Sequence, residues 1–171
     1  MNKSLFSSIL AITLILSCSS AEIFSMHNRI TTLNNGFFIE HECLSIDDDG
    51  DFLVDDESIQ NFQLTLFSST RNKIGYICFE INQKNSFSEI TGLSILKENY
   101  KRQGHATTLL TLIFDILKRN QIAQVKLEVT RKNRPARNLY DKLGFVPIEN
   151  QEADSKINQE KTLNLIKILQ Q

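Results

Sequence analysis

The sequence predicts an α+β domain in which a mixed, mostly antiparallel sheet is flanked by helices. Three observations predict this class: short alternating apolar segments come first, two helical patterns follow, and a strand-like segment separates those helices. The resulting order, β-β-β-α-β-α-β-β, is typical of an α+β or mixed-sheet domain. The 171 residues include 41% apolar residues and carry a formal net charge of −1. These values fit one globular domain and give no overall attraction for nucleic acid.

The strands expected before the first helix follow a polar stretch. Residues 22–36 are mixed and polar, and we interpret them as a linker into the domain. Gly36–Glu40 can open a first strand. Three alternating segments separated by polar turns then predict strands over Phe62–Phe67, Ile74–Ile81 and Glu89–Leu96.

A change of period predicts the first helix over Gly104–Arg119. Its apolar residues recur at offsets of three and four, which places them on one stripe of a helix. They are Ala106, Leu109, Leu110, Ile113, Phe114 and Leu117. Lys118 and Arg119 end the segment with positive charge, which is favourable at the carboxyl end of a helix.

The second helix is expected over Pro135–Leu143. Proline suits a first helical turn, where its missing N–H has no intrahelical acceptor, and Gly144 is a natural terminator. The remaining strands are predicted over Val125–Thr130, Phe145–Ile148 and Leu163–Leu169, with the tail from Lys161 to Gln171 as an edge strand.

The beginning of the chain is interpreted as a signal-peptide-like leader, residues 1–22, before a domain over residues 23–171. Lys3 gives a basic start, Leu5–Leu16 is apolar, and small residues continue to Ala21. This apolar run is short for a transmembrane helix, which needs roughly 20 residues. Cleavage after Ala21, lipidation of Cys18 and a retained, membrane-docked leader all stay open. Membrane association is therefore expected through the leader only.

The turn between Glu89–Leu96 and the first helix has the features of an anion site. The first N–H groups of a helix have no intrahelical partner, and the helix dipole favours negative charge there. Gly104 lets the main chain approach a phosphate without a Cβ in the way. Lys101, Arg102 and His105 add positive or potentially positive side chains at the same point. A diphosphate would suit such a site.

Two motifs then occur in sequence. Lys101-x-x-Gly104-x-Ala106 is similar to the pyrophosphate loop of the GNAT superfamily, the Gcn5-related N-acetyltransferases. About thirty residues later, the segment from Asn133 to Phe145 resembles the second signature of that family. There an asparagine is followed by alanine, leucine-tyrosine and a final glycine-phenylalanine. The resemblance covers roughly residues 62–145 and implies a GNAT, or acyl-CoA N-acyltransferase-like, fold.

The resemblance also implies roles for individual residues. The main-chain amides of Arg102, Gln103, Gly104, His105 and Ala106, in the loop that Lys101 opens, would hold the pyrophosphate of acetyl-CoA. Strand residues near Leu96 would pair with the pantetheine arm, and Asn133 would contact the cofactor. Tyr140 would protonate the departing thiolate, since a phenol has a reference pKa of about 10 and stays protonated at neutral pH.

Glu89 is the candidate general base, because Phe87-Ser88-Glu89-Ile90 resembles the corresponding strand of the histone-acetyltransferase branch. The spacing from Glu89 to the loop is one residue longer than in that branch. Many relatives use no dedicated base and accept an amine that is already neutral, so an exposed strand glutamate without a catalytic role stays an alternative.

The implied function is N-acetyltransfer from acetyl-CoA to a primary amine, by direct attack through a tetrahedral intermediate. The alternative is a non-catalytic acyl-CoA-binding or surface-anchored interaction domain that retains the fold. The amine can belong to a small molecule, a peptide or a protein, and no nucleic-acid partner is expected. Acetyl-CoA is cytosolic whereas the leader suggests export, so the localisation stays open.

The acidic segment Ser45–Asp56 superficially resembles a calcium-binding EF-hand loop, but no helix flanks it. A solvated acidic loop is the plainer interpretation, and its carboxylates can also attract a cationic acceptor. No metal site is expected, since neither the histidines nor the cysteines have ligand spacing. The two helices that usually separate the first two strands of the family are not recognisable over residues 40–61.

Overall fold

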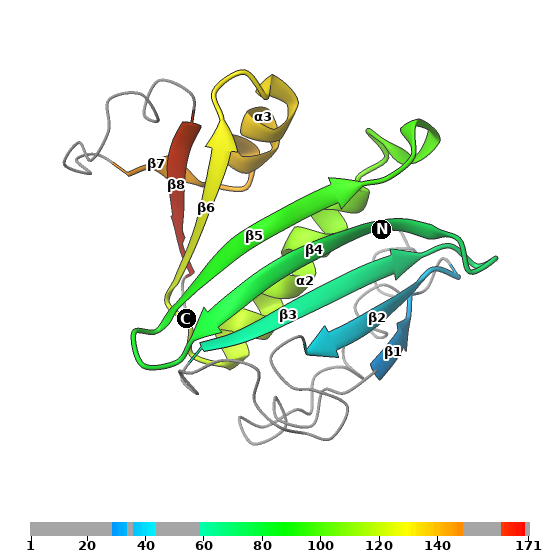
Figure 1. Ribbon diagram of the computed structural model, residues 1–171, viewed down its shortest axis with the longest axis horizontal. Helices are drawn as coiled ribbons and strands as arrows, with labels where there is room; N and C mark the ends of the chain where they lie inside the picture. The colour runs from blue at the N-terminus through cyan, green and yellow to red at the C-terminus, as the bar shows by residue number, and fades with distance from the viewer. Residues whose placement is uncertain (1–28, 34–35, 44–58, 149–161, 170–171) are drawn as a thin grey trace, which may run out of the picture.

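The computed structural model describes residues 29–33, 36–43, 59–148 and 162–169, which form one eight-stranded sheet with helices packed against it (Figure 1). The strands are β1 (Arg29–Thr32), β2 (Phe38–Cys43), β3 (Ile59–Phe67), β4 (Lys73–Asn82), β5 (Phe87–Ile95), β6 (Gln124–Thr130), β7 (Val146–Pro147) and β8 (Thr162–Ile168). The helices of this part are α2 (His105–Arg119), α3 (Arg134–Lys142) and the short 3-10 helix η2 (Glu98–Tyr100).

The strands lie in the order β1-β2-β3-β4-β5-β6-β8-β7. Each neighbouring pair is antiparallel except β5 and β6, which are parallel. A parallel pair needs a crossover connection, and α2 provides it between these two strands. The mixed sheet with helices confirms the predicted fold class.

The hydrophobic core lies between α2 and one face of the sheet; α2 is behind the sheet in Figure 1. Alternate residues of the central strands point to that face, for example Leu64 of β3 opposite Ile77 of β4, both almost fully buried. From α2, the predicted apolar stripe supplies Leu109, Leu110, Ile113, Phe114 and Leu117. Tight packing of these residues fixes the position of α2, and therefore of the turn before it, relative to β5.

The structure differs from the sequence-based prediction at both ends of the sheet. The segment interpreted as a linker, residues 22–36, contains β1, which pairs with β2 as an edge strand. The expected edge strand at the carboxyl end is instead an interior strand, because β8 lies between β6 and β7. Leu165 of β8 pairs with Leu127 of β6 and is buried, which explains why this strand takes an interior place.

Several expectations fall outside the described residues. The leader, residues 1–22, and the acidic segment Ser45–Asp56 belong to this group. Where the chain is described, none of its helices is long and apolar enough to cross a membrane. Export, lipidation and the role of the acidic segment therefore stay predictions.

Candidate active site

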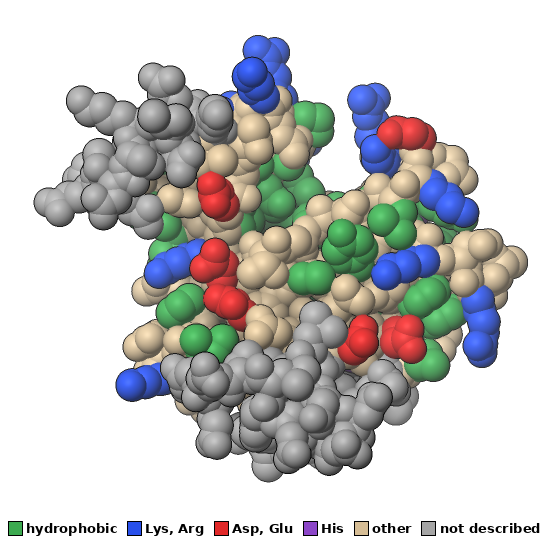
Figure 2. Space-filling model, in the orientation of Figure 1, with side chains coloured by type: hydrophobic (Ala, Val, Ile, Leu, Met, Phe, Trp, Pro, Cys, Tyr) green, Lys and Arg blue, Asp and Glu red, His purple; other side chains and the backbone are tan. Residues whose placement is uncertain are grey.

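The central feature of the site is an opening between β5 and β6. The two strands pair only over Phe87–Ile90 and Gln124–Leu127, yet β5 continues to Ile95 and β6 to Thr130. Beyond the paired part, the strands diverge toward their carboxyl ends (Figure 1). Figure 2 shows the surface hollowed between the end of β5 and the β6–α3 part, with apolar side chains inside the hollow. An extended ligand can enter here and reach the backbone of β5.

A β-bulge marks the start of this opening. Cys78 of β4 pairs with Gly92, but the next residue, Phe79, pairs with Ile90, so Thr91 is an extra residue in β5. A bulge bends its strand and increases the local twist. The bulge therefore turns the end of β5 away from β6. The bulge also agrees with the spacing between Glu89 and the turn, which is one residue longer than in the histone-acetyltransferase branch. This spacing is the one sequence signal that points to an extra residue such as Thr91.

The open edge of β5 presents main-chain groups to the hollow. The Leu96 N–H donates to the Ile74 carbonyl over 2.8 Å, so it faces β4. Backbone groups alternate sides along a strand, which directs those of Leu93 and Ile95 to the open edge. The main-chain donors and acceptors available to a pantetheine arm are therefore those of Leu93 and Ile95, the near neighbours of Leu96.

The turn after β5 exposes the first amides of α2. Gly104 caps this helix in the left-handed conformation, with φ of 85°, and its carbonyl accepts from the Thr108 N–H over 2.9 Å. The N–H groups of His105, Ala106 and Thr107 precede that first bond and have no intrahelical acceptor. A Cβ built on Gly104 would meet no atom within 4 Å, so this face of the turn is open. These features fit a diphosphate at the helix start.

The side chains around this turn contribute less positive charge than their types suggest. Lys101 forms an ion pair with Glu98, three residues earlier. The His105 imidazole packs against the rings of Phe37 and Tyr100, with centroid distances of 5.5 and 6.0 Å, and its Nε2 is buried. Of the three basic side chains expected at the anion site, His105 is thus directed into an aromatic cluster. Its main-chain N–H, in contrast, is one of the open amides at the start of α2.

The helix α3 begins with a side-chain cap. Asn133 Oδ1 accepts a hydrogen bond from the Ala136 N–H over 3.2 Å, and Pro135 occupies the first turn, as predicted. The side chain of Asn133 therefore positions α3. Its backbone lies at the carboxyl end of β6, on the opposite side of the hollow from Gly104.

The end of α3 fixes the direction of Tyr140. Gly144 has a φ of 80°, and its N–H donates to the Asp141 carbonyl over 2.9 Å, while the Phe145 N–H donates to the Tyr140 carbonyl over 3.0 Å. These two bonds form a Schellman motif, in which the residue after the glycine packs against the last turn. Here that contact is ring to ring: Phe145 meets Tyr140 edge to face at 5.5 Å and Phe114 of α2 at 6.0 Å.

The Tyr140 ring is 7% exposed, and burial raises the pKa of its hydroxyl above the usual value of 10. No residue in the described part of the chain hydrogen-bonds to this hydroxyl. A group of this kind is fully protonated at neutral pH and retains its proton for donation to a ligand.

Glu89 lies on the sheet face opposite the core, two residues before the bulge. Its neighbours across the strands are Glu80 of β4 and Lys126 of β6. Burial, and then repulsion from Glu89, raise the pKa of Glu80. The structure thus brings Glu89 beside a second carboxylate that the sequence analysis did not single out. Strand alternation alone could have placed both on one face, but their pairing depends on register.

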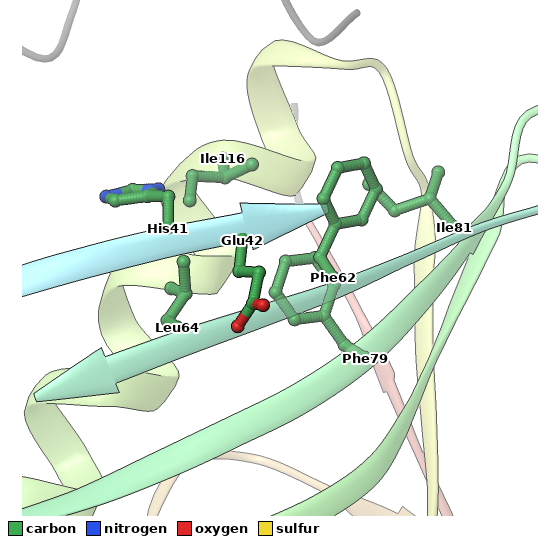
Figure 3. Close-up of a pocket in the computed structure, with 7 residues that line it drawn as sticks. All are labelled: His41, Glu42, Phe62, Leu64, Phe79, Ile81 and Ile116. Carbon is green, nitrogen blue, oxygen red and sulfur yellow. The ribbon is translucent and has the colours of Figure 1, made fainter. Parts of the chain in front are cut away.

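A separate small pocket lies at the other end of α2 (Figure 3). Its lining comes from β2, β3, β4 and α2, namely His41, Glu42, Phe62, Leu64, Phe79, Ile81 and Ile116. Ile116 is eleven positions along α2 from His105, roughly 16 Å at the rise of a helix. This pocket is therefore remote from the β5–β6 opening. Over the described ranges, no three His, Cys, Asp or Glu side chains are placed to hold a metal ion.

Comparisons with known proteins agree with this geometry. A model of the acetyltransferase (GNAT) family matches residues 28–145. None of the curated proteins matches the sequence significantly.

Among solved structures, the ribosomal-protein-S18-alanine N-acetyltransferase from Escherichia coli is 22% identical, with a TM-score of 0.52 over 68% of this chain and 72% of that one. The PaiA N-acetyltransferase from Thermoplasma acidophilum, in complex with coenzyme A, is 24% identical, with a TM-score of 0.52 over 63% of this chain and 60% of that one. Nourseothricin acetyltransferase is 14% identical, with a TM-score of 0.54 over 88% and 94%. At these identities the likeness shows a shared fold.

Proposed function

Since this chain belongs to the acetyltransferase (GNAT) family, whose activity is acyl transfer from CoA, we propose that it transfers an acetyl group from acetyl-CoA to a primary amine. The observation that carries the proposal is the opening between β5 and β6, which has exposed helix amides on one side and α3 with Tyr140 on the other. An extended thioester with a diphosphate at one end fits this opening: its diphosphate can bind the helix amides on one side, and its thioester can reach Tyr140 on the other.

In this proposal, each part of the opening has a separate task. The amides at the start of α2 hold the diphosphate, as anions bind at helix starts. The main-chain groups of Leu93 and Ile95 align the pantetheine arm along β5. A main-chain N–H at the bulged end of β5 polarises the thioester carbonyl, and its effect is large because the donor is already in place.

The chemistry then needs one nucleophile and one acid. The amine nitrogen attacks the carbonyl carbon, a C–N bond forms, and collapse of the tetrahedral intermediate breaks the C–S bond. Tyr140 donates its proton to the departing sulfur, and the nitrogen loses a proton to Glu89, directly or through water, or to solvent. The products are an amide and CoA with a free thiol.

The test is an acetyl-transfer assay with the full-length protein against polyamines, amino acids, peptide amino termini and protein lysines. We expect at least one amine to be acetylated, and the Tyr140→Phe variant to be slower by roughly 100-fold or more, the usual contribution of a positioned acid. Tyr100→Phe is the matched control, because it also removes one phenolic hydroxyl. CoA binding without turnover of any amine would instead favour the non-catalytic acyl-CoA-binding domain.

A further inference from the structure

The segment between β6 and the first turn of α3 carries a cluster of positive charge that the proposed chemistry does not use. Four of its seven residues are basic, and none is acidic: Arg131, Lys132, Arg134 and Arg137. All four are exposed. We call residues 131–137 the basic segment.

The topology places the basic segment on the rim of the β5–β6 opening. β5 and β6 are parallel, so their carboxyl ends lie at the same edge of the sheet. The turn with Gly104 follows β5, and the basic segment follows β6. Figure 2 shows Lys and Arg side chains on both sides of the hollow between them. A ligand bound in the opening therefore emerges between two basic rims.

The charges of the basic segment are available to an anion. Arg137 Nη1 donates to the Arg131 carbonyl over 3.0 Å, which uses part of one guanidinium and steadies the segment. For Lys132 and Arg134, the described residues include no acidic partner. On the opposite rim, by contrast, Glu98 already neutralises Lys101. Among the described residues, Lys132 and Arg134 are thus two neighbouring uncompensated charges on this rim, whereas Arg102 is a single one in the turn of the opposite rim.

The donor in the proposed function has an anionic group beyond its diphosphate. The ribose of CoA follows the diphosphate directly and carries a separate phosphate monoester, with a charge of about −1.5 to −2 at neutral pH. With the diphosphate on the α2 amides, the ribose must lie at the rim of the opening. We propose that the basic segment, through Lys132 and Arg134, binds the ribose phosphate and selects CoA over its dephosphorylated form. This inference rests on the proposed function.

The test measures binding rather than turnover. The full-length protein is titrated calorimetrically with CoA and with dephospho-CoA, which lacks the ribose phosphate. The double variant Lys132→Ala/Arg134→Ala is compared with the control Lys84→Ala/Lys118→Ala. The control removes two exposed charges, from the β4–β5 turn and the end of α2, at the opposite end of the sheet. Thermal melts verify that each variant is folded.

We expect the wild-type protein to bind CoA more tightly than dephospho-CoA. The Lys132→Ala/Arg134→Ala variant should lose about fivefold in CoA affinity at low salt, as expected for two exposed ion pairs. Its affinity for dephospho-CoA should stay unchanged, and higher salt should reduce the difference.

Equal affinity of the wild-type protein for CoA and dephospho-CoA would overturn the assignment. An equal loss of affinity for both ligands in the Lys132→Ala/Arg134→Ala variant would also overturn it, because such a loss indicates only a general surface potential. Absence of binding of either ligand would overturn the proposed function and this subsite with it. The control variant must bind CoA and dephospho-CoA with the affinities of the wild-type protein. A fivefold loss of CoA affinity in the control would also contradict the assignment.

Discussion

The Phe145 N–H donates to the Tyr140 carbonyl over 3.0 Å, and the two rings meet edge to face with centroids 5.5 Å apart. Both contacts depend on Gly144, whose left-handed conformation lets the chain reverse at the end of α3. Phe145 in turn packs against Phe114 of α2. The glycine-phenylalanine pair is therefore more than a helix end. It fixes the tyrosine of the last turn against α2, the helix that begins at the proposed anion site.

This relationship predicts the effect of Phe145→Leu. Leucine retains most of the buried volume, so we expect a loss of about 1 kcal/mol in the free energy of unfolding. The Tyr140 ring loses its edge contact, so the acetyl-transfer rate should fall while the affinity for acetyl-CoA is maintained. Urea denaturation, kinetics and calorimetry check these three quantities. Val146→Ala, at the next and exposed position, should change none of them; an unaltered rate in Phe145→Leu would contradict the positioning role.

Gly104 and Gly144 allow conformational strain to be separated from cofactor binding. Both have left-handed φ values, 85° and 80°, so alanine at either position should cost about 1 kcal/mol of stability. Only the Cβ at position 104 would stand where the proposed donor site brings a diphosphate to the α2 amides. We therefore expect Gly104→Ala to weaken acetyl-CoA binding about tenfold by calorimetry, on the scale of one lost charged hydrogen bond. Equal affinities of the two variants would count against the anion site.

Gly75 sets the distance between β4 and β5. A Cβ at this position would lie 2.4 Å from the Ser94 carbonyl oxygen and 2.7 Å from Ile95 Cδ1. Gly75→Ala must therefore move β5, and overpacking of this kind costs about 1–3 kcal/mol. We expect lower stability in urea denaturation and weaker acetyl-CoA binding, since the open edge of β5 moves with it.

Gly92→Ala provides the control for this change in the partner strand. Its Cβ would find its nearest neighbour, the Cys78 Cβ, at an ordinary 3.7 Å. This variant should retain stability within about 0.5 kcal/mol of the wild-type protein. A comparable loss in both variants would show that strand propensity, rather than the close approach of β5, explains the effect.

The Glu80–Glu89 pair predicts that a substitution that removes the charge of Glu80 stabilises the protein at neutral pH but not at acidic pH. Burial and the neighbouring Glu89 raise the pKa of Glu80 in the folded state. A raised carboxyl pKa means that folding favours the protonated form, so stability falls as pH rises through the unfolded and then the folded pKa. Glu80→Gln should therefore raise Tm at pH 7 and leave it nearly unchanged at pH 4. Thermal melts at both values check this, and an equal shift at the two would exclude ionisation of Glu80 as the cause.

The sequence predicted most of what local chemistry determines. The stripe of α2, the proline and glycine that bound α3, and the class of the sheet follow from periodicity and from backbone preferences of single residues. The places of β1 and β8 do not, because pairing partners are chosen by long-range burial. Leu165 of β8 is buried opposite Leu127 of β6, and β7 pairs with the other edge of β8, so the interior place of this strand depends on two partners that its own pattern does not specify.

The candidate site shows the same division. Gly104 and Tyr140 belong to motifs with a local physical reason, a left-handed cap and a helix end. The spacing between Glu89 and the turn indicates one extra residue, but the place of the bulge at Thr91 and the direction of the Leu96 N–H depend on register between strands, which no local pattern specifies. The His105 ring is directed into the cluster with Phe37, a residue far away in sequence, so its inward direction could not be foreseen.

The most direct test of the account is a calorimetric titration of the full-length protein with acetyl-CoA. If the α2 amides and the open edge of β5 form the donor site, the titration gives a saturable heat with one ligand per chain, and the ligand raises Tm. No heat of binding, together with an unchanged Tm at millimolar acetyl-CoA, would contradict the central claim.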